Sequence, residues 1–232
     1  MSDTPLHIAI IPDGNRRWAK KQSLSPWKGH EKSAKNFQDI SLWCRDDPRV
    51  SILTIWCFST ENWKRDPKEV EKLMIMLEKN LQSERTNFMK NNTRLLRSGR
   101  TDRLSPSLKK LLEDICEETE DNSGFTTHLL LDYGGKDELL RAMNKLTTHN
   151  SQLTTNSQIT DEDIRNQLDQ PNLPNIDLII RTSEEKRTSN FNLWQSTYAE
   201  WIFHPKLFPD FTTEDLSECI EEYANRTRRF GA

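Results

Sequence analysis

Short apolar runs alternate along the chain with longer segments in which apolar residues recur every three or four positions. The short runs are rich in isoleucine, leucine and valine, a pattern typical of strands that are covered on both faces of a sheet. A further stretch, residues 191–203, is rich in aromatic side chains and is assigned to no element. We expect five strands, at residues 7–11, 50–58, 94–98, 125–131 and 176–180.

The longer segments predict amphipathic helices. We expect them at residues 30–45, 67–88, 106–118, 137–146 and 160–168, with a last helix capped by Thr212. Thr160 and Asp163 resemble a capping box, and residues 147–158, rich in Ser, Thr, Asn and Gln, are predicted to form a surface loop. Strands that alternate with helices indicate an α/β fold with a mainly parallel sheet, in one domain of residues 1–232.

Polar side chains follow four of the predicted strands where each strand ends. The first strand stops at Pro12, which cannot donate a ladder hydrogen bond, and a turn then leads into two arginines. Carboxyl ends of parallel strands meet at one edge of a sheet, where α/β proteins bind ligands. That edge should collect Asp13, Arg16, Arg17, Ser59, Glu61, Asn62, Arg65, Arg181, Arg187 and Ser189. A carboxylate among several cations suits two diphosphates and a divalent metal.

Three of these signals also have simpler explanations. Asp-Gly-Asn tripeptides punctuate many ordinary loops. His30, expected in the first turn of its helix where a ring N–H can reach a phosphate, could equally be a structural histidine. The apolar stripe on the helix after Pro67 either packs against the sheet or lines a site for an apolar ligand. Its members are Val70, Leu73, Met74, Leu77 and Leu81.

The composition argues against several other classes of protein. With 33 basic and 36 acidic residues the net charge is −3, so no global field attracts nucleic acid or an anionic membrane. The four cysteines lack zinc-site or disulfide spacing, and neither a bilayer-spanning run nor a signal peptide is recognisable, so we expect a cytoplasmic protein. Neither G-x-x-x-x-G-K-S/T nor G-x-G-x-x-G is present, which argues against nucleotide triphosphatases and dinucleotide enzymes.

In order along the chain, these clusters resemble the cis-prenyltransferase family, typified by undecaprenyl diphosphate synthase. Each segment alone is a weak match, but all of them in sequence are highly specific, up to the Arg228-Arg229-Phe230-Gly231 ending. The other matching segments are Pro12-Asp13-Gly14-Asn15-Arg16-Arg17-Trp18-Ala19, Gly29-His30, Phe58-Ser59-Thr60-Glu61-Asn62-Trp63, Tyr133-Gly134-Gly135, Ile180-Arg181-Thr182, and Arg187-Thr188-Ser189-Asn190-Phe191 running through Leu193-Trp194-Gln195 to Tyr198-Ala199-Glu200.

The resemblance implies a six-stranded parallel sheet flanked by helices, a hydrophobic tunnel beside it, and a homodimer. The implied activity is Mg²⁺-dependent condensation of isopentenyl diphosphate onto an allylic diphosphate, such as farnesyl diphosphate, with new cis double bonds. The implied product is a polyprenyl diphosphate, the precursor of a lipid carrier that is delivered to the membrane. An enzyme with that product could lie peripherally at the membrane without a transmembrane segment.

The family's functional residues carry over to the matching positions. Asp13 would bind Mg²⁺ and the allylic diphosphate, and Glu200 would supply a second metal contact. Asn62, with Ser59 nearby, is placed where the substrate loses its proton. The groups around the allylic substrate are Gly14, Asn15, Arg16, Arg17, His30, Trp63 and Arg65. Those that bind isopentenyl diphosphate are Arg181, Arg187 and Ser189. The remaining positions assigned to substrate binding are Trp18, Thr60, Glu61 and Thr188.

Four departures from the family pattern accompany the matches. Pro26 stands where an arginine usually precedes the Gly-His pair by three residues, and Ser33 replaces a glycine. The usual Thr-Gly-Gly-Glu reads Thr182-Ser183-Glu184-Glu185, which replaces two permissive glycines and adds a carboxylate beside an anion site. Asp132 stands where asparagine is common. None of these changes removes a proposed metal ligand.

Three hypotheses follow. The first is an active cis-prenyltransferase that makes a polyprenyl diphosphate, and retention of the proposed catalytic and metal residues favours it. The second is a non-catalytic family member that serves as a structural partner in a heteromeric complex. The third is an enzyme of the same fold with a short or branched product, which the altered Ser183-Glu184 segment leaves open.

Overall fold

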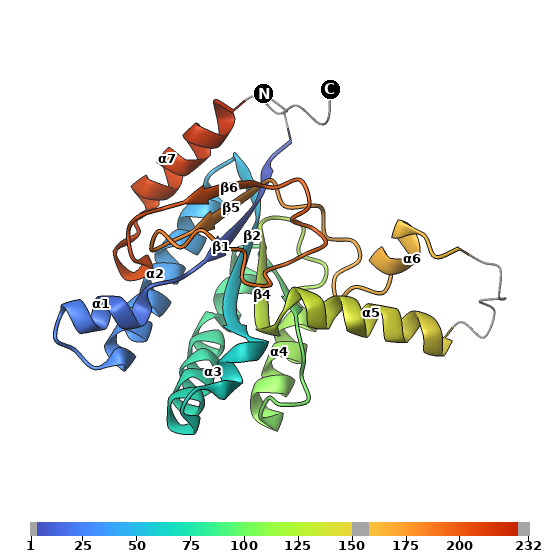
Figure 1. Cartoon of the computed structure of the whole chain (residues 1–232), viewed down its shortest axis with the longest axis horizontal. Helices are drawn as coiled ribbons and strands as arrows, with labels where there is room; N and C mark the ends of the chain where they lie inside the picture. Colours follow the sequence, from blue (N-terminus) through green and yellow to red (C-terminus); the bar gives the residue numbers. More distant parts are fainter. Residues whose placement is uncertain (1–3, 150–157, 227–232) are drawn as a thin grey trace.

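The computed structural model describes residues 4–149 and 158–226 and shows a six-stranded parallel sheet (Figure 1). The strand order is β3-β4-β2-β1-β5-β6, and each neighbouring pair is parallel. The strands are β1 Leu6–Ile11, β2 Val50–Ser59, β3 Arg94–Ser98, β4 Thr126–Tyr133, β5 Leu178–Arg181 and β6 Glu200–Phe203. The sheet predicted from the sequence is therefore confirmed.

Helices occupy the connections between the strands. They are α1 Asn15–Lys21, α2 Pro26–Asp46, α3 Pro67–Lys90, α4 Pro106–Glu118, α5 Gly135–His149, α6 Asp161–Arg165 and α7 Thr213–Ala224, with 3₁₀ turns η1 Thr60–Lys64 and η2 Phe208–Asp210. Three of the long helices begin with proline at the first helical position, where its missing N–H is not needed. None of the described helices combines the length and the apolar character that crossing a membrane requires.

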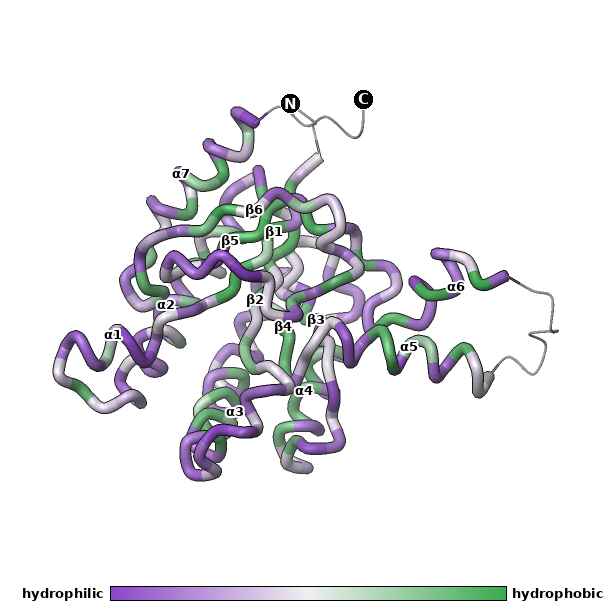
Figure 2. Tube along the Cα trace, viewed as in Figure 1, coloured by the Kyte–Doolittle hydropathy of each residue, from purple (hydrophilic) through white to green (hydrophobic). Residues whose placement is uncertain are grey.

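Both faces of the sheet are covered by apolar side chains. In β1, Ile8 and Ile10 join the larger core cluster, which includes side chains of α2, α3, α4 and α7. Ala9 and Ile11 point to the opposite face, into a smaller cluster that contains Phe191. Figure 2 shows hydrophobic residues concentrated along the central strands. The alternation of side chains along β1 therefore explains why its sequence is apolar throughout.

Several predicted boundaries differ from the structure. The strand β6 was not predicted, because it has four residues and its pattern is masked by the aromatic segment around it. The loop predicted at residues 147–158 begins too early, because α5 continues to His149, and residues 150–157 lie outside the described residues, as does the Arg228–Gly231 ending. The helix predicted to end at residue 168 ends at Arg165. His30 lies in the second turn of α2 rather than the first, because that helix begins at Pro26.

A series of buried hydrogen bonds crosses the face of the sheet that carries the smaller apolar cluster. Nδ1 of His7 lies 3.0 Å from the carbonyl oxygen of Pro174, and because that oxygen can only accept, Nδ1 is the donor. Nε2 of the neutral ring therefore accepts a hydrogen bond from the Thr54 hydroxyl at 2.7 Å. The Thr54 oxygen in turn lies 3.0 Å from Nδ1 of His128, whose Nε2 lies 2.9 Å from the Ser98 hydroxyl. Every polar atom of this series is satisfied while both histidines are neutral.

The two histidines predict a loss of stability in acid. Burial lowers the pKa of His7 to about 4 and that of His128 to about 3, from 6.5. As the pH falls below 6.5, the unfolded chain takes up protons that the folded chain cannot bind, so the free energy of unfolding decreases. Between pH 8 and pH 5 each histidine should contribute a loss of about 2 kcal/mol.

Urea unfolding of the wild type and of His128→Gln at both pH values measures this effect. The variant should lose less stability between pH 8 and pH 5 than the wild type, by about 2 kcal/mol. An identical pH dependence of the free energy of unfolding in the two proteins would contradict the lowered pKa of His128.

Candidate active site

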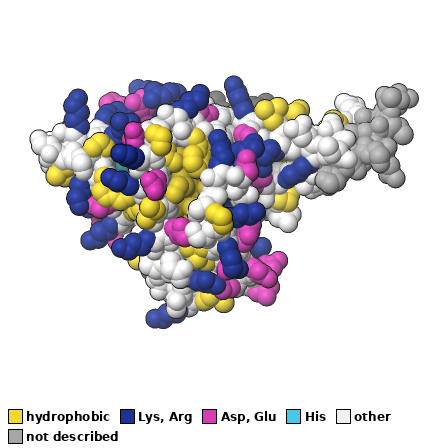
Figure 3. All heavy atoms as spheres, turned by 90° about the horizontal axis from the view of Figure 1, so that it is seen from below, with side chains coloured by type: hydrophobic (Ala, Val, Ile, Leu, Met, Phe, Trp, Pro, Cys, Tyr) yellow, Lys and Arg dark blue, Asp and Glu magenta, His cyan; other side chains and the backbone are white. Residues whose placement is uncertain are grey.

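A polar cavity of about 460 Å³ lies at the carboxyl ends of the central strands. The chain leaves β1 toward β2 on one side and later returns to β5 on the other, which is the point in an open α/β sheet where ligands bind. The space-filling view from below shows basic and acidic side chains beside a hydrophobic area (Figure 3). The predicted site residues that line this cavity are Asp13, Asn15, His30, Ser59, Glu61, Asn62, Arg65, Arg181 and Ser189.

Asp13 and Arg181 join the ends of β1 and β5. Nη2 of Arg181 donates to Oδ2 of Asp13 at 2.8 Å, and Nη1 donates to the Ser189 hydroxyl at 2.8 Å and to the carbonyl of Arg187. Arg181 is only 4% exposed, and its Nε has no hydrogen-bond partner among the described residues. Segments more than 160 residues apart in sequence therefore converge on one guanidinium, as predicted.

A second group of charges surrounds Arg17. Its Nη2 lies 2.7 Å from the Ser183 hydroxyl, 3.1 Å from Oε1 of Glu185 and 3.6 Å from Oδ1 of Asp13. Glu185 also pairs with Arg187 at 2.5 Å. Arg17 and Arg187, which do not line the cavity themselves, are thus linked to it through Asp13 and Glu185.

Asn62 is fixed by the 3₁₀ turn η1. Its Oδ1 accepts from the backbone N–H of Ser59 at 3.2 Å, as part of a capping box. One lone pair of the oxygen is therefore used, and the amide N–H groups are what Asn62 can donate to a substrate. On the same turn Glu61 accepts from Nδ2 of Asn190 at 3.2 Å, so Asn190 ties η1 to the loop that follows β5.

His30 and Arg65 form the opposite wall of the cavity. Nε2 of His30 is buried without a hydrogen-bond partner and lies 3.9 Å from Glu69, which also pairs with Arg65 at 3.4 Å. Burial is the largest of the effects that lower the pKa of His30 from 6.5 to about 4. The charges of Arg65 and Arg16 act in the same direction, and Glu69 opposes them. At neutral pH the ring is uncharged, so it can donate to a phosphate oxygen without adding positive charge.

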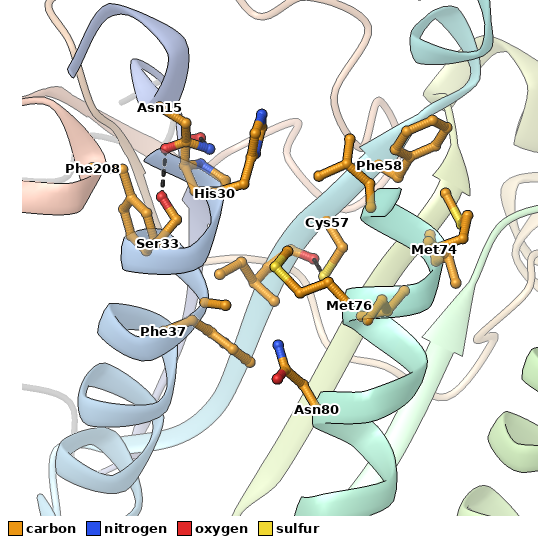
Figure 4. A pocket seen from close by; sticks show the side chains of 16 residues that line it. Asn15, His30, Ser33, Phe37, Cys57, Phe58, Met74, Met76, Asn80 and Phe208 are labelled. Carbon is orange, nitrogen blue, oxygen red and sulfur yellow. Dashed lines mark hydrogen bonds between the residues drawn. The ribbon is translucent and has the colours of Figure 1, made fainter. Parts of the chain in front are cut away.

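Two apolar chambers lie beside the polar cavity, in the space between α2 and α3, and the hydrophobic tunnel that the resemblance implies stays a prediction. The first, of about 110 Å³, shares His30, Cys57 and Leu73 with the cavity, and the second, of about 100 Å³, follows it. Figure 4 shows Phe37 of α2 facing Met76 and Asn80 of α3 across the first chamber. The predicted stripe on α3 thus does both things considered for it: Leu73 and Leu81 are core residues, and the stripe also lines the chambers.

The family model described as putative undecaprenyl diphosphate synthase matches residues 11–231. The chain belongs to that family. An isoprenyl transferase from Helicobacter pylori is 42% identical over 231 residues, covering 100% of this chain and 98% of the relative. An isoprenyl transferase from Treponema pallidum is 39% identical over 226 residues, covering 97% of this chain and 98% of the relative. The chain is therefore an isoprenyl transferase that forms cis double bonds, as that family does.

Two solved structures share the fold over essentially their whole length. Lavandulyl diphosphate synthase from Lavandula x intermedia, in complex with dimethylallyl diphosphate, has a TM-score of 0.94 at 31% identity and covers 100% of both chains. A probable undecaprenyl diphosphate synthase from Campylobacter jejuni has a TM-score of 0.80 at 30% identity and covers 99% of both chains. The six-stranded sheet and its flanking helices are thus those of the undecaprenyl diphosphate synthase family.

Some residues carried over from the family do not reach the cavity of this isoprenyl transferase. Trp18 donates its indole N–H to Asp210 at 2.7 Å, toward η2. Trp63 packs edge-on against Phe58 and lies under the guanidinium of Arg103. Arg16, Thr60 and Thr188 do not line the cavity within the described part of the chain either, and Gly14 contributes its N–H to Oδ1 of Asp13.

Glu200 is not among the described residues that line the polar cavity. It begins β6 and pairs with Leu178 at the start of β5, whereas the cavity lies beyond Arg181 at the end of β5. That offset corresponds to about 10 Å along the strands. The Glu200 carboxylate instead accepts from Arg226 at 2.8 Å. Within one chain the Glu200 carboxylate therefore lies away from Asp13, and the metal contact that the resemblance implies for Glu200 stays a prediction.

The family's metal ion can be tested against the remaining donors. No group of three or more His, Cys, Asp or Glu side chains among residues 4–149 and 158–226 could hold a metal ion by itself. Mg²⁺, however, is usually held by one or two carboxylates together with substrate phosphates and water. Asp13, whose side chain is 31% exposed at the cavity, fits the part of that single carboxylate. The donor set fits a metal that arrives with a diphosphate.

Other lining residues were not predicted from the sequence. Asn190 was noted only as part of a matching segment, although its amide lines the cavity. Phe37, Cys57 and Met76 line the apolar chambers, and their positions gave no signal because core residues show the same pattern. Asp132 is buried and paired with Arg103, so this departure from the family adds an internal ion pair rather than a charge at the cavity.

Ser183 and Glu184, which replace two neighbouring family glycines, lie in left-handed backbone. The φ angle of Ser183 is 71° and that of Glu184 is 62°. Glycine adopts this region freely, whereas other residues there cost about 1–2 kcal/mol. Ser183 is buried and bonded to Arg17, but Glu184 is exposed, and its carboxylate makes no ion pair within the described chain. Substitution by glycine should therefore have different effects at Ser183 and at Glu184.

Glu184→Gly should stabilise the isoprenyl transferase. Relief of the left-handed strain exceeds the entropy that glycine adds to the unfolded chain, so the free energy of unfolding should rise by about 0.5–1 kcal/mol. The Michaelis constant for isopentenyl diphosphate should not rise, since the exposed carboxylate contacts nothing in the site. Urea unfolding and steady-state kinetics measure the two quantities. A markedly higher Michaelis constant would show that Glu184 has a positive role in binding.

Proposed function

We propose that the enzyme condenses isopentenyl diphosphate with an allylic diphosphate such as farnesyl diphosphate, in a Mg²⁺-dependent reaction that yields a polyprenyl diphosphate. The observation that carries this proposal is a polar cavity, built around Asp13 and Arg181, that shares lining residues with an apolar chamber between α2 and α3. A substrate that fits both parts has an anionic head and a long apolar tail. Prenyl diphosphates have that chemistry.

The cations of the cavity stabilise charge that develops as the allylic substrate ionises. Breaking its C–O bond puts negative charge on the leaving diphosphate, and fixed guanidinium and N–H donors stabilise that charge without reorganising. Arg17 and His30 lie on the side of α1 and α2, and we assign them to the allylic diphosphate. Arg181, Arg187 and Ser189 cluster at the end of β5, and we assign them to isopentenyl diphosphate.

Asp13 is the residue that would hold Mg²⁺ together with the allylic diphosphate. When bound, the metal neutralises the diphosphate and makes it a better leaving group. Arg181 pairs with the Asp13 carboxylate and keeps it next to the place where the diphosphate would bind. Asp13 therefore both orients Arg181 and offers the one carboxylate that a metal–diphosphate complex needs.

Asn62 would orient the substrate at the step in which a proton is lost. A neutral amide is a poor base, and its oxygen already accepts from Ser59. The N–H donors that remain can hold a diphosphate oxygen, and that oxygen is the better proton acceptor. This assignment gives Asn62 a positioning role and places the basic group on the substrate.

The growing prenyl tail would occupy the two apolar chambers. Release of a polyprenyl product to a membrane follows from its chemistry, because such a tail is insoluble in water. The tail site adjoins the cavity, so substrate and product share one channel.

We also propose a homodimer, which would cover exposed apolar side chains such as Leu140 and Met143 of α5, 61% and 50% exposed respectively.

Incubation of the purified protein with Mg²⁺, farnesyl diphosphate and labelled isopentenyl diphosphate tests the activity. Elongated product should form and should be lost in EDTA. Asp13→Ala should reduce turnover by at least a hundredfold, as expected when a group that stabilises the leaving group is removed. Circular dichroism of the variant should match that of the wild type.

Two other results would change the conclusion. No product with any primer would favour a non-catalytic partner in a heteromeric complex. A short or branched product would favour the third hypothesis, for which the TM-score of 0.94 to lavandulyl diphosphate synthase is the supporting observation. Product analysis by mass spectrometry separates these cases.

Asn80 should limit product length. Asn80 is a lining residue of both chambers and also of an outer groove near Trp27 and Ile75. A tail that passes Asn80 must remove water from the side-chain amide without replacing its hydrogen bonds, at a cost of about 1–3 kcal/mol. Asn80→Leu removes this cost, so its products should be longer than those of the wild type. Lys79→Ala, on the outer side of α3, is the control, and equal product lengths in all three proteins would contradict the role.

A further inference from the structure

Ser183 stands out among the residues near the cavity because its backbone is unfavourable and its side chain is engaged. Its φ of 71° lies in the left-handed region, where the family usually has glycine. The residue is buried, its N–H donates to the carbonyl of Lys206 at 2.7 Å, and its Cβ lies against Gly14. A serine at such a position needs a contact that a glycine could not make.

That contact is with Arg17. The Ser183 hydroxyl accepts a hydrogen bond from Nη2 of Arg17 at 2.7 Å. The Arg17 side chain is 48% exposed and belongs to α1, a helix of seven residues. The bond to a buried hydroxyl therefore holds the half-exposed guanidinium in place beside Asp13.

The other two acceptors of Arg17 differ from Ser183 in charge. Glu185 at 3.1 Å and Asp13 at 3.6 Å are carboxylates. An incoming diphosphate repels carboxylates and competes with them for the same guanidinium. A hydroxyl carries no charge, so it can keep its hydrogen bond to Arg17 while the remaining N–H groups of the guanidinium turn to the diphosphate.

We propose that Ser183 is a positioning residue that tethers Arg17 at the diphosphate site. This proposal rests on the proposed function, since it concerns how Arg17 meets the allylic diphosphate. Glycine has no hydroxyl and could not hold Arg17 in this way. The hydrogen bond to Arg17 is therefore what compensates for the unfavourable left-handed backbone of Ser183.

Three variants separate the hydroxyl from the backbone strain. Ser183→Gly removes both, Ser183→Ala removes only the hydroxyl, and Glu184→Gly relieves strain at the next residue without touching Arg17. The Michaelis constant for the allylic diphosphate should rise roughly three- to tenfold in both Ser183 variants, the effect of one accessible hydrogen bond, with a smaller change in kcat. It should stay unchanged in Glu184→Gly. The Tm should be higher in Ser183→Gly than in Ser183→Ala, by roughly 2–4 °C.

A double-mutant cycle with Arg17→Gln shows whether Ser183 acts through Arg17. In the Arg17→Gln background, Ser183→Gly should have no further effect on the Michaelis constant. An unchanged Michaelis constant in Ser183→Gly and Ser183→Ala would overturn the proposal, as would an equal effect of Ser183→Gly with and without Arg17.

Direct binding keeps this test independent of catalysis. Calorimetry with inorganic pyrophosphate alone should show weaker binding to Ser183→Gly than to the wild type, by the same factor as the Michaelis constant. If the wild type makes no prenyl product but this difference is present, the proposed function fails and the tether stands. If product forms and the difference is absent, the tether fails and the function stands.

Discussion

The ion pair between Asp13 and Arg181 is the contact on which the rest of the site depends. The pair joins the ends of two neighbouring strands, and Thr182 adds a hydrogen bond from its hydroxyl to the Asp13 carbonyl at 2.8 Å. A guanidinium that is 4% exposed would be costly without a carboxylate, because burying an unpaired charge loses its hydration. Asp13 therefore makes a buried cation possible at the place where diphosphates would bind.

The same compensation recurs around the cavity. Glu185 pairs with Arg17 and Arg187, and Glu69 pairs with Arg65. These carboxylates neutralise a set of cations that would otherwise repel one another. A diphosphate that enters exchanges one anionic partner for another, so the cations need little rearrangement to receive it. Pre-positioned donors of this kind are the main source of transition-state stabilisation in group-transfer enzymes.

Sequence patterns predicted the elements and the convergence of the polar groups better than the direction of individual side chains. Asp13 and Arg181 were predictable because each follows an apolar strand, and the carboxyl ends of parallel strands meet. Glu200 and Trp18 were not, because their roles depend on features that no local pattern carries. Glu200 begins a strand instead of following one, and Trp18 is turned away by a hydrogen bond to Asp210, 192 residues away in sequence. The apolar chambers were unpredictable for a related reason: a side chain that lines a cavity and one that fills a core have the same polarity.

The serines at two family glycine positions both contact α1. Ser33 donates to Oδ1 of Asn15 at 2.6 Å, and Ser183 accepts from Arg17. The third departure, Pro26, removes a cation from the start of α2 but is a favourable first residue for that helix. A site with one cation fewer depends more on how precisely the others are held, because the energy of a charge pair falls with distance and with exposure to water. Hydroxyls that hold Asn15 and Arg17 supply that precision without cancelling any charge, which is why serine is compatible with a diphosphate site at positions where a carboxylate would not be.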